Sequence, residues 1–490
     1  MKKVIFLMID SLMPHVLEQC IEQRMVPALH FFRENGWYWK ECTSVFPTMT
    51  ASVDFSLIAG EYPDQHRVPA LIWYDAEENR LINYTNGALP VWKLGFFPCT
   101  RDVLCLLNDK HFSSQVSTIY EELAERGKTS GSINLIARRS YHKYKVKIPF
   151  LLRLATKFKR FDDVSGPDLL TIGRVVRPKL NPPLPWGWDE MVFNKYGVND
   201  SFATRMLNHL IKYHLLPDFT MVYLPDNDHQ VHRHPRKACH ILQKVDRKLQ
   251  SILNQFATWE EALQKYTFII TGDHGQTIIG PDETNRIDLE GLLSGFSITS
   301  YGDKVSEGHD IVLANNERMT FIYLLKPQLE SDVIAKLQGD PRIDVIGWKK
   351  GEWVQVRSGV KKGTLCYRKG GQIRDPYDQS WEVQGDLDLL DIRLENGQQL
   401  FYGEYPDALS RLHAALYSQD VNLLACTAKP GYEFKSAYAP THLNGGSHGS
   451  MHKVDSTVPL IISGALGEKP FNLVRLVDLK DYILQLLTEY

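Results

Sequence analysis

The chain of 490 residues lacks the cysteine pattern of a disulfide-stabilised or zinc-ribbon protein. Its seven cysteines are scattered, odd in number and form no Cys-x-x-Cys pair, which argues against a disulfide framework. Cys426 lies in the apolar run VNLLACTA and is expected in the core. This usage favours free thiols in a reducing compartment, and we therefore predict a cytoplasmic protein.

Long hydrophobic runs and a strong excess of one charge are also missing. No stretch approaches the roughly 18 apolar residues that a membrane span requires. The N-terminal run VIFLMI meets an aspartate and no small-residue cleavage site follows, so we predict a buried first strand rather than a signal peptide. A net charge of −2 argues against a nucleic acid polymer as the partner.

The composition that remains is that of an ordinary globular protein. With 43% apolar and 23% charged residues, the chain is not an extended disordered one. Residues 1–309 and 411–490 alternate between strand-like and helical segments, whereas residues 310–410 are short, alternating and turn-punctuated, which is typical of β-rich structure. We predict an α/β sandwich with a central, mostly parallel sheet, helices on both faces, and a smaller β-rich α+β cap inserted at 310–410.

Side chains of metal-binding types follow three of the apolar runs. Asp10 follows VIFLMI. Asp228 and His232 follow FTMVYL at a spacing that places both on one side of a helical turn. Asp273 and His274 follow TFIITG. Because ligands gather at the carboxyl ends of parallel strands, we expect these side chains to converge.

A fourth candidate is His448, which glycines frame in the run GGSHGS. The alternative for each motif is a solvated polar turn. The run PDNDHQVHRHP also offers Asp226, His229 and His234, so the choice within it stays open. His442 is expected either at the surface or in contact with the metal ligands without binding the metal itself.

A hydroxyl candidate, Thr50, lies in FPTMTAS where a turn enters a helix. A helix N-terminus suits a phosphoryl oxygen, and a metal ion would make the hydroxyl a competent nucleophile. The alternatives are that Thr48 or Thr50 only caps the helix, or that Ser52 is the nucleophile. Three aspartates, three histidines and one hydroxyl are enough to hold two divalent metals and to attack phosphorus.

The run FPTMTASVDFSLIAGEYPDQHRV resembles the nucleophile segment of the nucleotide pyrophosphatase/phosphodiesterase family, within the alkaline phosphatase superfamily. The matching positions are Thr48, Thr50, Gly60, Tyr62, Pro63, His66 and the later pair Tyr74-Asp75. The family's Asp-x-x-x-His, Gly-Asp-His-Gly and His-Gly runs are similar to Asp228–His232, Gly272–Gly275 and His448-Gly449. The resemblance spans residues 1–290 and 420–465.

The resemblance implies two zinc sites and a small phosphoester substrate. The metal that activates water would be held by Asp228, His232 and His448. The metal that activates the nucleophile would be held by Asp10, Thr50, Asp273 and His274. The implied reaction is two-metal hydrolysis of a phosphodiester or nucleotide pyrophosphate through a phosphoryl-threonine at Thr50.

The substrate-binding positions depart from the family pattern more than the metal ligands do. Val53 stands where the nucleotide phosphodiesterases have an asparagine, and Asp54 where a histidine is usual. The family also has an asparagine shortly before the Tyr-Asp pair, and this chain has none there, with Leu71 nearby. Asn227 stands where the family usually has a proline before the metal-binding aspartate. A phosphomonoesterase or phosphonate hydrolase of the same superfamily stays open, as does a metal-stabilised binding protein. The Cys-x-Pro-x-Arg type of run that a sulfatase needs is not found.

Residues 143–161, KYKVKIPFLLRLATKFKRF, combine positive charge with a helical period beyond Pro149. The apolar residues at that spacing are Leu151, Leu154, Ala155, Phe158 and Phe161. Three interpretations are open: a solvated helix, a lid that presents positive charge to an anionic substrate, and a patch that contacts anionic lipid.

Overall fold

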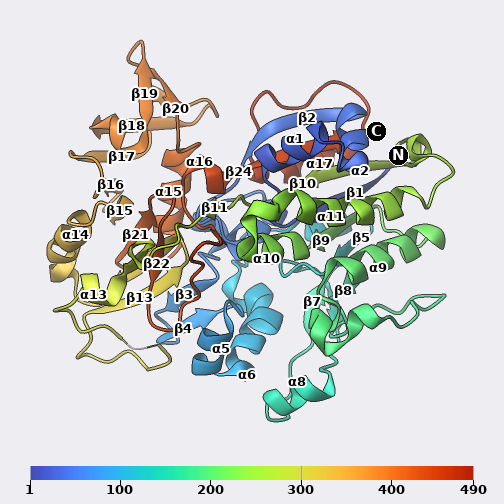
Figure 1. Ribbon diagram of the computed structural model, residues 1–490, viewed down its shortest axis with the longest axis horizontal. Coiled ribbons are helices and arrows are strands. Elements are labelled where there is room, and N and C mark those ends of the chain that lie inside the picture. The colour runs from blue at the N-terminus through green and yellow to red at the C-terminus, as the bar shows by residue number, and fades with distance from the viewer. Residues whose placement is uncertain (1, 300, 489–490) are drawn as a thin grey trace.

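The computed structural model describes residues 2–299 and 301–488, and at its centre lies a seven-stranded sheet (Figure 1). The strand order is β2-β24-β10-β1-β9-β5-β8. The bounds are β1 (Lys3–Ile9), β2 (Gly36–Thr43), β5 (Ser130–Ile133), β8 (Leu169–Thr171), β9 (Phe219–Leu224), β10 (Tyr266–Thr271) and β24 (Thr457–Ser463). The five strands from β10 to β8 are parallel, whereas β24 runs antiparallel between β2 and β10.

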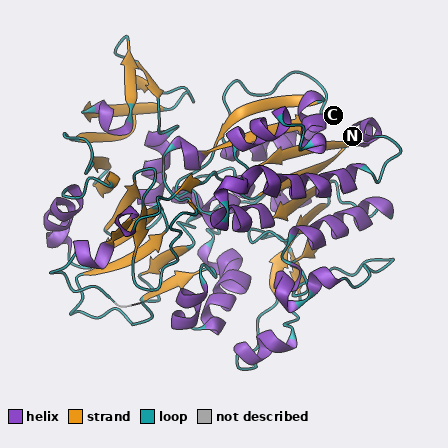
Figure 2. Ribbon diagram, in the orientation of Figure 1, coloured by secondary structure: helices purple, strands orange, loops and turns teal. Residues whose placement is uncertain are grey.

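The apolar run of β1 is nearly continuous because both faces of this strand are buried. Its alternate residues enter two different cores, one on each face of the sheet. The first core is covered by α3 (Thr50–Ala59), α7 (Ile119–Glu125) and α17 (Leu479–Thr488). The second is covered by α1 (Pro14–Glu22), α2 (Pro27–Glu34), α9 (Asp200–Lys212) and α11 (Ala238–Leu253). The predicted α/β sandwich is confirmed (Figure 2).

Shorter elements connect and flank this sandwich. The helices are α4 (Pro63–His66), α5 (Ala88–Leu94), α6 (Phe96–Arg101), α8 (Phe150–Ala155), α10 (Asp226–Arg233), α12 (Trp259–Lys265), α13 (Leu289–Leu292) and α16 (Lys453–Ser456). The strands are β3 (Ile72–Asp75), β4 (Arg80–Asn83), β6 (His142–Tyr144), β7 (Val164–Gly166), β11 (Thr277–Ile278), β12 (Arg286–Asp288), β22 (Glu433–Lys435) and β23 (Gly446–Ser447).

A second, mostly antiparallel sheet contains the β-rich segment. Its path is β13-β14-β21-β15-β16-β17-β20-β19, with β18 paired to β17. The bounds are β13 (Ile311–Asn316), β14 (Met319–Leu324), β15 (Ile343–Lys350), β16 (Trp353–Arg357), β17 (Leu365–Arg374), β18 (Ser380–Gly385), β19 (Ile392–Glu395), β20 (Gln399–Tyr402) and β21 (Leu423–Ala428). Helices α14 (Glu330–Gln338) and α15 (Ala408–Tyr417) pack on its opposite faces.

Strand β21 shows that this sheet continues past residue 410. It pairs with β14 on one side and β15 on the other, so a boundary at 410 would separate β21 from both partners. The sequence alone could not show this, because an apolar run such as VNLLACTA fits a buried strand of either sheet. The division into a catalytic domain and a cap stays a prediction.

The helix predicted beyond Pro149 is shorter than its periodicity suggested. α8 ends at Ala155, and Lys157 and Phe158 adopt left-handed backbone angles (φ 51° and 57°) that a right-handed helix cannot contain. Phe161 instead packs on Phe97, with 5.1 Å between ring centroids. The apolar spacing was therefore not that of one continuous helix.

The prediction that all cysteines are free was wrong. Cys20 of α1 and Cys239 of α11 form a disulfide, with 5.5 Å between their Cα atoms. The other five are free thiols, and Cys426 is buried as expected. Residues 219 positions apart become neighbours only because two helices pack on the same face of the sheet, which cysteine spacing cannot reveal.

No helix within residues 2–299 and 301–488 combines the length and apolarity needed to cross a bilayer.

Candidate metal centre

The three central strands end beside one another, and the loops that follow them carry the predicted ligands. β1 lies between β10 and β9, all parallel. Asp10 directly follows β1, and its backbone N–H donates to Leu224 O of β9 (3.0 Å). Asn227 Nδ2 then donates to Asp10 O (2.8 Å). Sequence segments more than 200 residues apart are thus joined at the carboxyl edge of the sheet.

A first group consists of Asp10, Asp273 and His274, here called the Asp10 cluster. Their potential ligand atoms lie within 4.8 Å of one another, and the three side chains are almost completely buried. His274 Nε2 is 3.5 Å from Asp10 Oδ1 and 3.3 Å from Asp273 Oδ2. Within the described residues these three atoms have no hydrogen-bond partner. Two buried carboxylate oxygens and an imidazole nitrogen in this arrangement fit a divalent cation.

A second set of side chains, Asp228, His232 and His448, is here called the Asp228 cluster. The potential ligand atoms of Asp228 and His448 lie within 4.8 Å of one another and of His274, whereas those of His232 lie within that distance of Glu317 and His442. Asp228 Oδ1 is 3.2 Å from His232 Nε2 and 4.0 Å from His448 Nε2. Asp228 and His232 are one turn apart on α10, as predicted. The two clusters adjoin, because the rings of His274 and His448 stack with 3.6 Å between their centroids.

The histidines of both clusters are oriented by their other ring nitrogen. The Nδ1 of His232 pairs with Gly446 O (2.7 Å), that of His448 with Thr48 O (2.7 Å), and that of His274 with Gly275 O (3.1 Å). A carbonyl can only accept, so each Nδ1 carries a proton, and in the neutral form of each ring the lone pair is on Nε2. This is the usual arrangement of metal-binding histidines.

The His448 loop is held against the Asp273-His274 loop by backbone contacts. β23 pairs with β11 through Ser447 and Thr277. Gly275 N donates to Asp455 O (2.8 Å), and a Cβ at Gly275 would lie only 2.2 Å from Val454 O. Only glycine permits that approach, which explains why the motif ends in glycine.

Burial and neighbouring charges shape the ionisation of the clusters. Burial raises the pKa of Asp10 well above its ordinary value, and the Asp273 and Asp228 carboxylates raise it further. Burial acts in the same direction on Asp228, but His232 and His448 outweigh it and lower the pKa. Burial lowers the pKa of His448 to about 4. A bound cation would relieve the repulsion between the carboxylates and favour the neutral imidazole.

The hydroxyl candidates differ in their surroundings. Thr50 is the first residue of α3 and is half-buried. Thr48 is fully buried, and its Oγ1 accepts from Gly449 N (2.9 Å) and donates to Ser450 O (3.2 Å). Ser52 donates to Pro69 O (2.9 Å). Thr48 and Ser52 therefore have structural hydrogen bonds, and Thr50 stands at the helix end where backbone N–H groups lack intrahelical partners.

The structure also separates the alternatives that the sequence left open around Asp228. Asp226 accepts from Asp200 N (3.1 Å) at the start of α9, so its carboxylate is engaged there. His229 and His234 are exposed. Neither belongs to a potential metal group among the described residues.

Glu317 is the acidic residue that the sequence analysis missed. It lies in the turn between β13 and β14 of the second sheet and is 6% exposed. Its carboxylate forms a group with His232 and His442 in which the ligand atoms lie within 4.8 Å of one another. Three imidazoles, led by His448, hold its pKa at about 2 although burial alone would raise it. No motif contains Glu317, so only the tertiary structure could identify it.

A family model described as type I phosphodiesterase / nucleotide pyrophosphatase matches residues 4–451. The chain belongs to this family. By class it is thus a phosphoester hydrolase, and the predicted family resemblance is confirmed. No curated protein matches the chain.

Solved structures of the alkaline phosphatase superfamily share the fold of this phosphodiesterase-family chain. Human ectonucleotide pyrophosphatase/phosphodiesterase 5 is 16% identical with a TM-score of 0.58, over 99% of this chain and 95% of that one. An inactive murine counterpart in complex with AMP is 14% identical with the same TM-score and coverages. Phosphonoacetate hydrolase from Sinorhizobium meliloti 1021, in complex with phosphonoformate, is 15% identical with a TM-score of 0.55, over 99% and 96%.

Proposed function

We propose that the chain is a two-zinc phosphodiesterase that acts through a phosphothreonine at Thr50. The observation that carries the proposal is the Asp10 cluster, in which three fully buried ligand atoms converge without hydrogen-bond partners. Imidazole and carboxylate donors suit zinc. Family membership supports the reaction class, and the half-buried Thr50 at the start of α3 supports the choice of nucleophile.

When bound, two cations would acidify the threonine hydroxyl and a water molecule and would offset charge on the phosphoryl oxygens. The residues of the chain provide the positioning. Thr50 Oγ forms a bond to phosphorus in line with the ester bond that breaks, and the leaving alcohol departs. The N–H groups of the first turn of α3 would be available to donate to the phosphoryl oxygens. Water then attacks the phosphorus of this intermediate, the bond from phosphorus to Thr50 Oγ breaks, and the threonine hydroxyl is restored as the phosphomonoester product leaves.

The preference for a diester rests on the family, and a different activity of the same superfamily also has support. One relative was solved with AMP, whereas phosphonoacetate hydrolase was solved with a phosphonate. Val53 supplies no side-chain amide for the substrate, so a phosphomonoesterase or phosphonate hydrolase activity is the second candidate.

A substrate comparison tests the function. We expect the purified, zinc-loaded protein to hydrolyse an aryl phosphodiester with a kcat/KM at least tenfold above those for an aryl phosphomonoester and for phosphonoacetate. A clear preference for either of the latter would replace the diester assignment. No turnover of any of the three would favour a metal-stabilised binding protein.

The compartment is part of the proposal. The cytoplasmic location was predicted from free thiols, and the disulfide between Cys20 and Cys239 removes that support. Because disulfides persist in oxidising compartments, we infer that the protein works in one.

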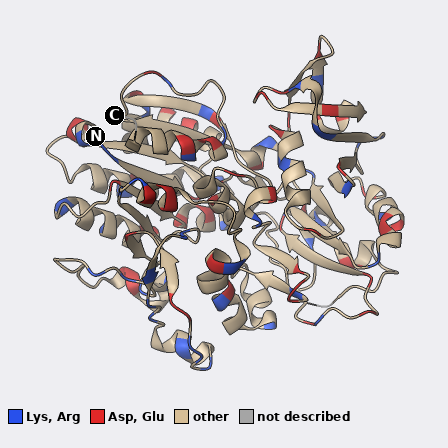
Figure 3. Ribbon diagram, turned by 180° about the vertical axis from the view of Figure 1, so that it is seen from behind, with Lys and Arg blue, Asp and Glu red and all other residues tan. Residues whose placement is uncertain are grey.

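A second, independent proposal is peripheral contact of α8 and the following residues with an anionic membrane surface. Its large apolar side chains Phe150, Leu151, Leu154 and Phe158 are 66%, 53%, 45% and 55% exposed. Exposed cations lie between and directly after them, at Arg153, Lys157, Lys159 and Arg160. Figure 3 shows the basic residues of this segment at the edge of the molecule. Apolar side chains interleaved with cations are typical of surfaces that insert shallowly among anionic headgroups.

Charge reversal tests the membrane contact. We expect the native protein to sediment with vesicles rich in phosphatidylserine, and the double variant Lys157→Glu/Arg160→Glu to remain in the supernatant with unchanged hydrolysis of a soluble diester. The control Lys362→Glu/Arg393→Glu changes two exposed cations outside this segment and should sediment normally. A raised KM without any vesicle binding would favour the lid instead, and unchanged behaviour in both assays would leave a solvated helix.

A further inference from the structure

Glu317 brings a carboxylate from the second sheet to the Asp228 cluster. Its Oε2 lies 3.8 Å from His448 Nε2 and 3.8 Å from His442 Nδ1. Its backbone is in the left-handed region (φ 61°), which is uncommon for a residue with a side chain. Such a conformation persists only where the surroundings enforce it.

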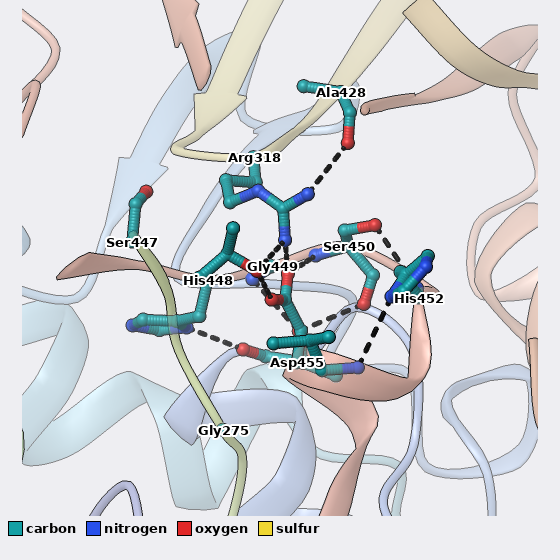
Figure 4. A network of polar contacts seen from close by, with 12 residues as sticks. Gly275, Arg318, Ala428, Ser447, His448, Gly449, Ser450, His452 and Asp455 are labelled. Atoms are coloured by element: carbon teal, nitrogen blue, oxygen red, sulfur yellow. Dashed lines mark hydrogen bonds and ion pairs between the residues drawn. The ribbon is translucent and has the colours of Figure 1, made fainter. Parts of the chain in front are cut away.

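The surroundings of the turn are rigid. Arg318 N donates to His448 O (2.9 Å), and its guanidinium forms a buried ion pair with Asp455 and donates to Ala428 O (2.9 Å) (Figure 4). At Gly449 (φ 118°), an added Cβ would lie 2.7 Å from Asn316 O. The turn that carries Glu317 is therefore fixed to the loop that carries His448.

The hydrogen bonds of Glu317 leave its carboxylate unsaturated. Oε2 accepts from Ser447 Oγ (3.0 Å) and His448 N (3.2 Å), whereas a carboxylate has about four acceptor positions. His442 is engaged elsewhere, because it contacts Glu433 through its backbone N–H (2.5 Å) and its Nδ1 (3.3 Å). The described ion pairs of this almost fully buried carboxylate are with imidazoles, and none is with lysine or arginine. Because an imidazole that binds a metal ion is neutral, the metal ion itself would then balance the charge of Glu317.

We propose that Glu317 is a direct ligand of the metal ion at the Asp228 cluster. The donor atoms at this point are separated by 3.2 Å (Asp228 to His232), 4.0 Å (Asp228 to His448) and 3.8 Å (His448 to Glu317). Ligands about 2.0–2.2 Å from one zinc ion lie roughly 3–4 Å apart, so small side-chain shifts would suffice, and a fifth coordination position would remain for the water that this metal activates. The inference rests on the proposed two-metal function and gives this site two carboxylates, as the Asp10 cluster has.

Zinc affinity without substrate tests the ligand role. We expect the native protein to bind two zinc ions in a competition titration against a chromogenic chelator, and Glu317→Gln to bind one of them at least tenfold more weakly. Glu317→Gln should also change the visible absorption of the cobalt-substituted protein, since that absorption reports the ligand set. Glu433→Gln is the matched control, because Glu433 is buried beside the same turn but contacts His442, and it should keep both affinities and the spectrum.

The outcomes separate the inference from the proposed function. Native protein that binds no zinc would overturn the two-metal function itself. Native affinities and an unchanged cobalt spectrum in Glu317→Gln would overturn only the ligand role of Glu317. If Glu317→Gln does not fold, Glu317→Asp keeps the charge on a side chain one methylene shorter. It should fold and still bind that zinc more weakly, and an unchanged affinity would count against the proposal.

Discussion

Replacing Thr50 with alanine should lower the rate of phosphodiester hydrolysis by roughly 10³-fold or more. The loss is large because the variant has no hydroxyl to form the phosphothreonine, and only direct attack by water remains. The melting temperature should stay close to the native value, since Thr50 is half-buried at a helix end. Zinc should still bind, because Asp10, Asp273 and His274 remain. Steady-state kinetics, metal analysis and thermal unfolding measure the three quantities.

Thr48→Ala is the matched control for this substitution. It removes a hydroxyl two residues away that bonds to Gly449 and Ser450, so it should cost about 1 kcal/mol of stability per lost hydrogen bond and far less rate. If Thr48→Ala instead abolished turnover and Thr50→Ala did not, Thr48 would be the nucleophile. Trapping of a phosphorylated peptide that contains Thr50 would identify the intermediate directly.

Removal of metal should abolish activity completely, and added zinc should restore it. The Asp10 and Asp228 clusters place three carboxylates close together without a lysine or arginine among their described ion pairs, so the metal-free site is electrostatically unfavourable. Two zinc ions per chain are expected by elemental analysis. A bound metal ion whose free concentration is 1,000 times its Kd adds about 4 kcal/mol to the free energy of unfolding. The chelated protein should therefore also melt at a lower temperature.

Two neighbouring aspartates provide the control for metal binding. Asp228→Asn should lower zinc content and rate together, whereas Asp226→Asn should keep two zinc ions because Asp226 contacts Asp200 instead. Equal losses in the two variants would show that the ligand in this loop had been misassigned. Active protein without bound metal would contradict the two-metal proposal.

The parts of the centre that the sequence could predict are those in which a motif follows a buried strand. Asp10 and Asp273 follow apolar runs that form adjacent parallel strands, and strand neighbours of this kind place their loops together whatever the intervening sequence. The i, i+4 spacing likewise predicted that Asp228 and His232 share one turn of α10. Local periodicity was enough because each of these relations depends on one element or one pair of strands.

The features that escaped prediction depend on packing between distant elements. Glu317 has no motif around it, and it approaches His448 only because a hairpin of the second sheet docks on the histidine loop. The disulfide between Cys20 and Cys239 likewise requires that α1 and α11 pack together. Helix α8 ends early because Lys157 and Phe158 adopt left-handed backbone angles. Lysine and phenylalanine are not residue types that predict such angles.

The position of β24 has a consequence for synthesis of the protein. This strand pairs with β10 and β2, which emerge from the ribosome far earlier, and it follows the His448 loop and the short helix α16 in the chain. Until residues 457–463 are made, β10 and β2 each present an unpaired edge, and until His448 is made, the metal centre lacks a histidine. A nascent chain, or one truncated before His448, is therefore expected to be inactive and prone to edge-to-edge aggregation. We expect hydrolysis only after β24 has paired with both β10 and β2.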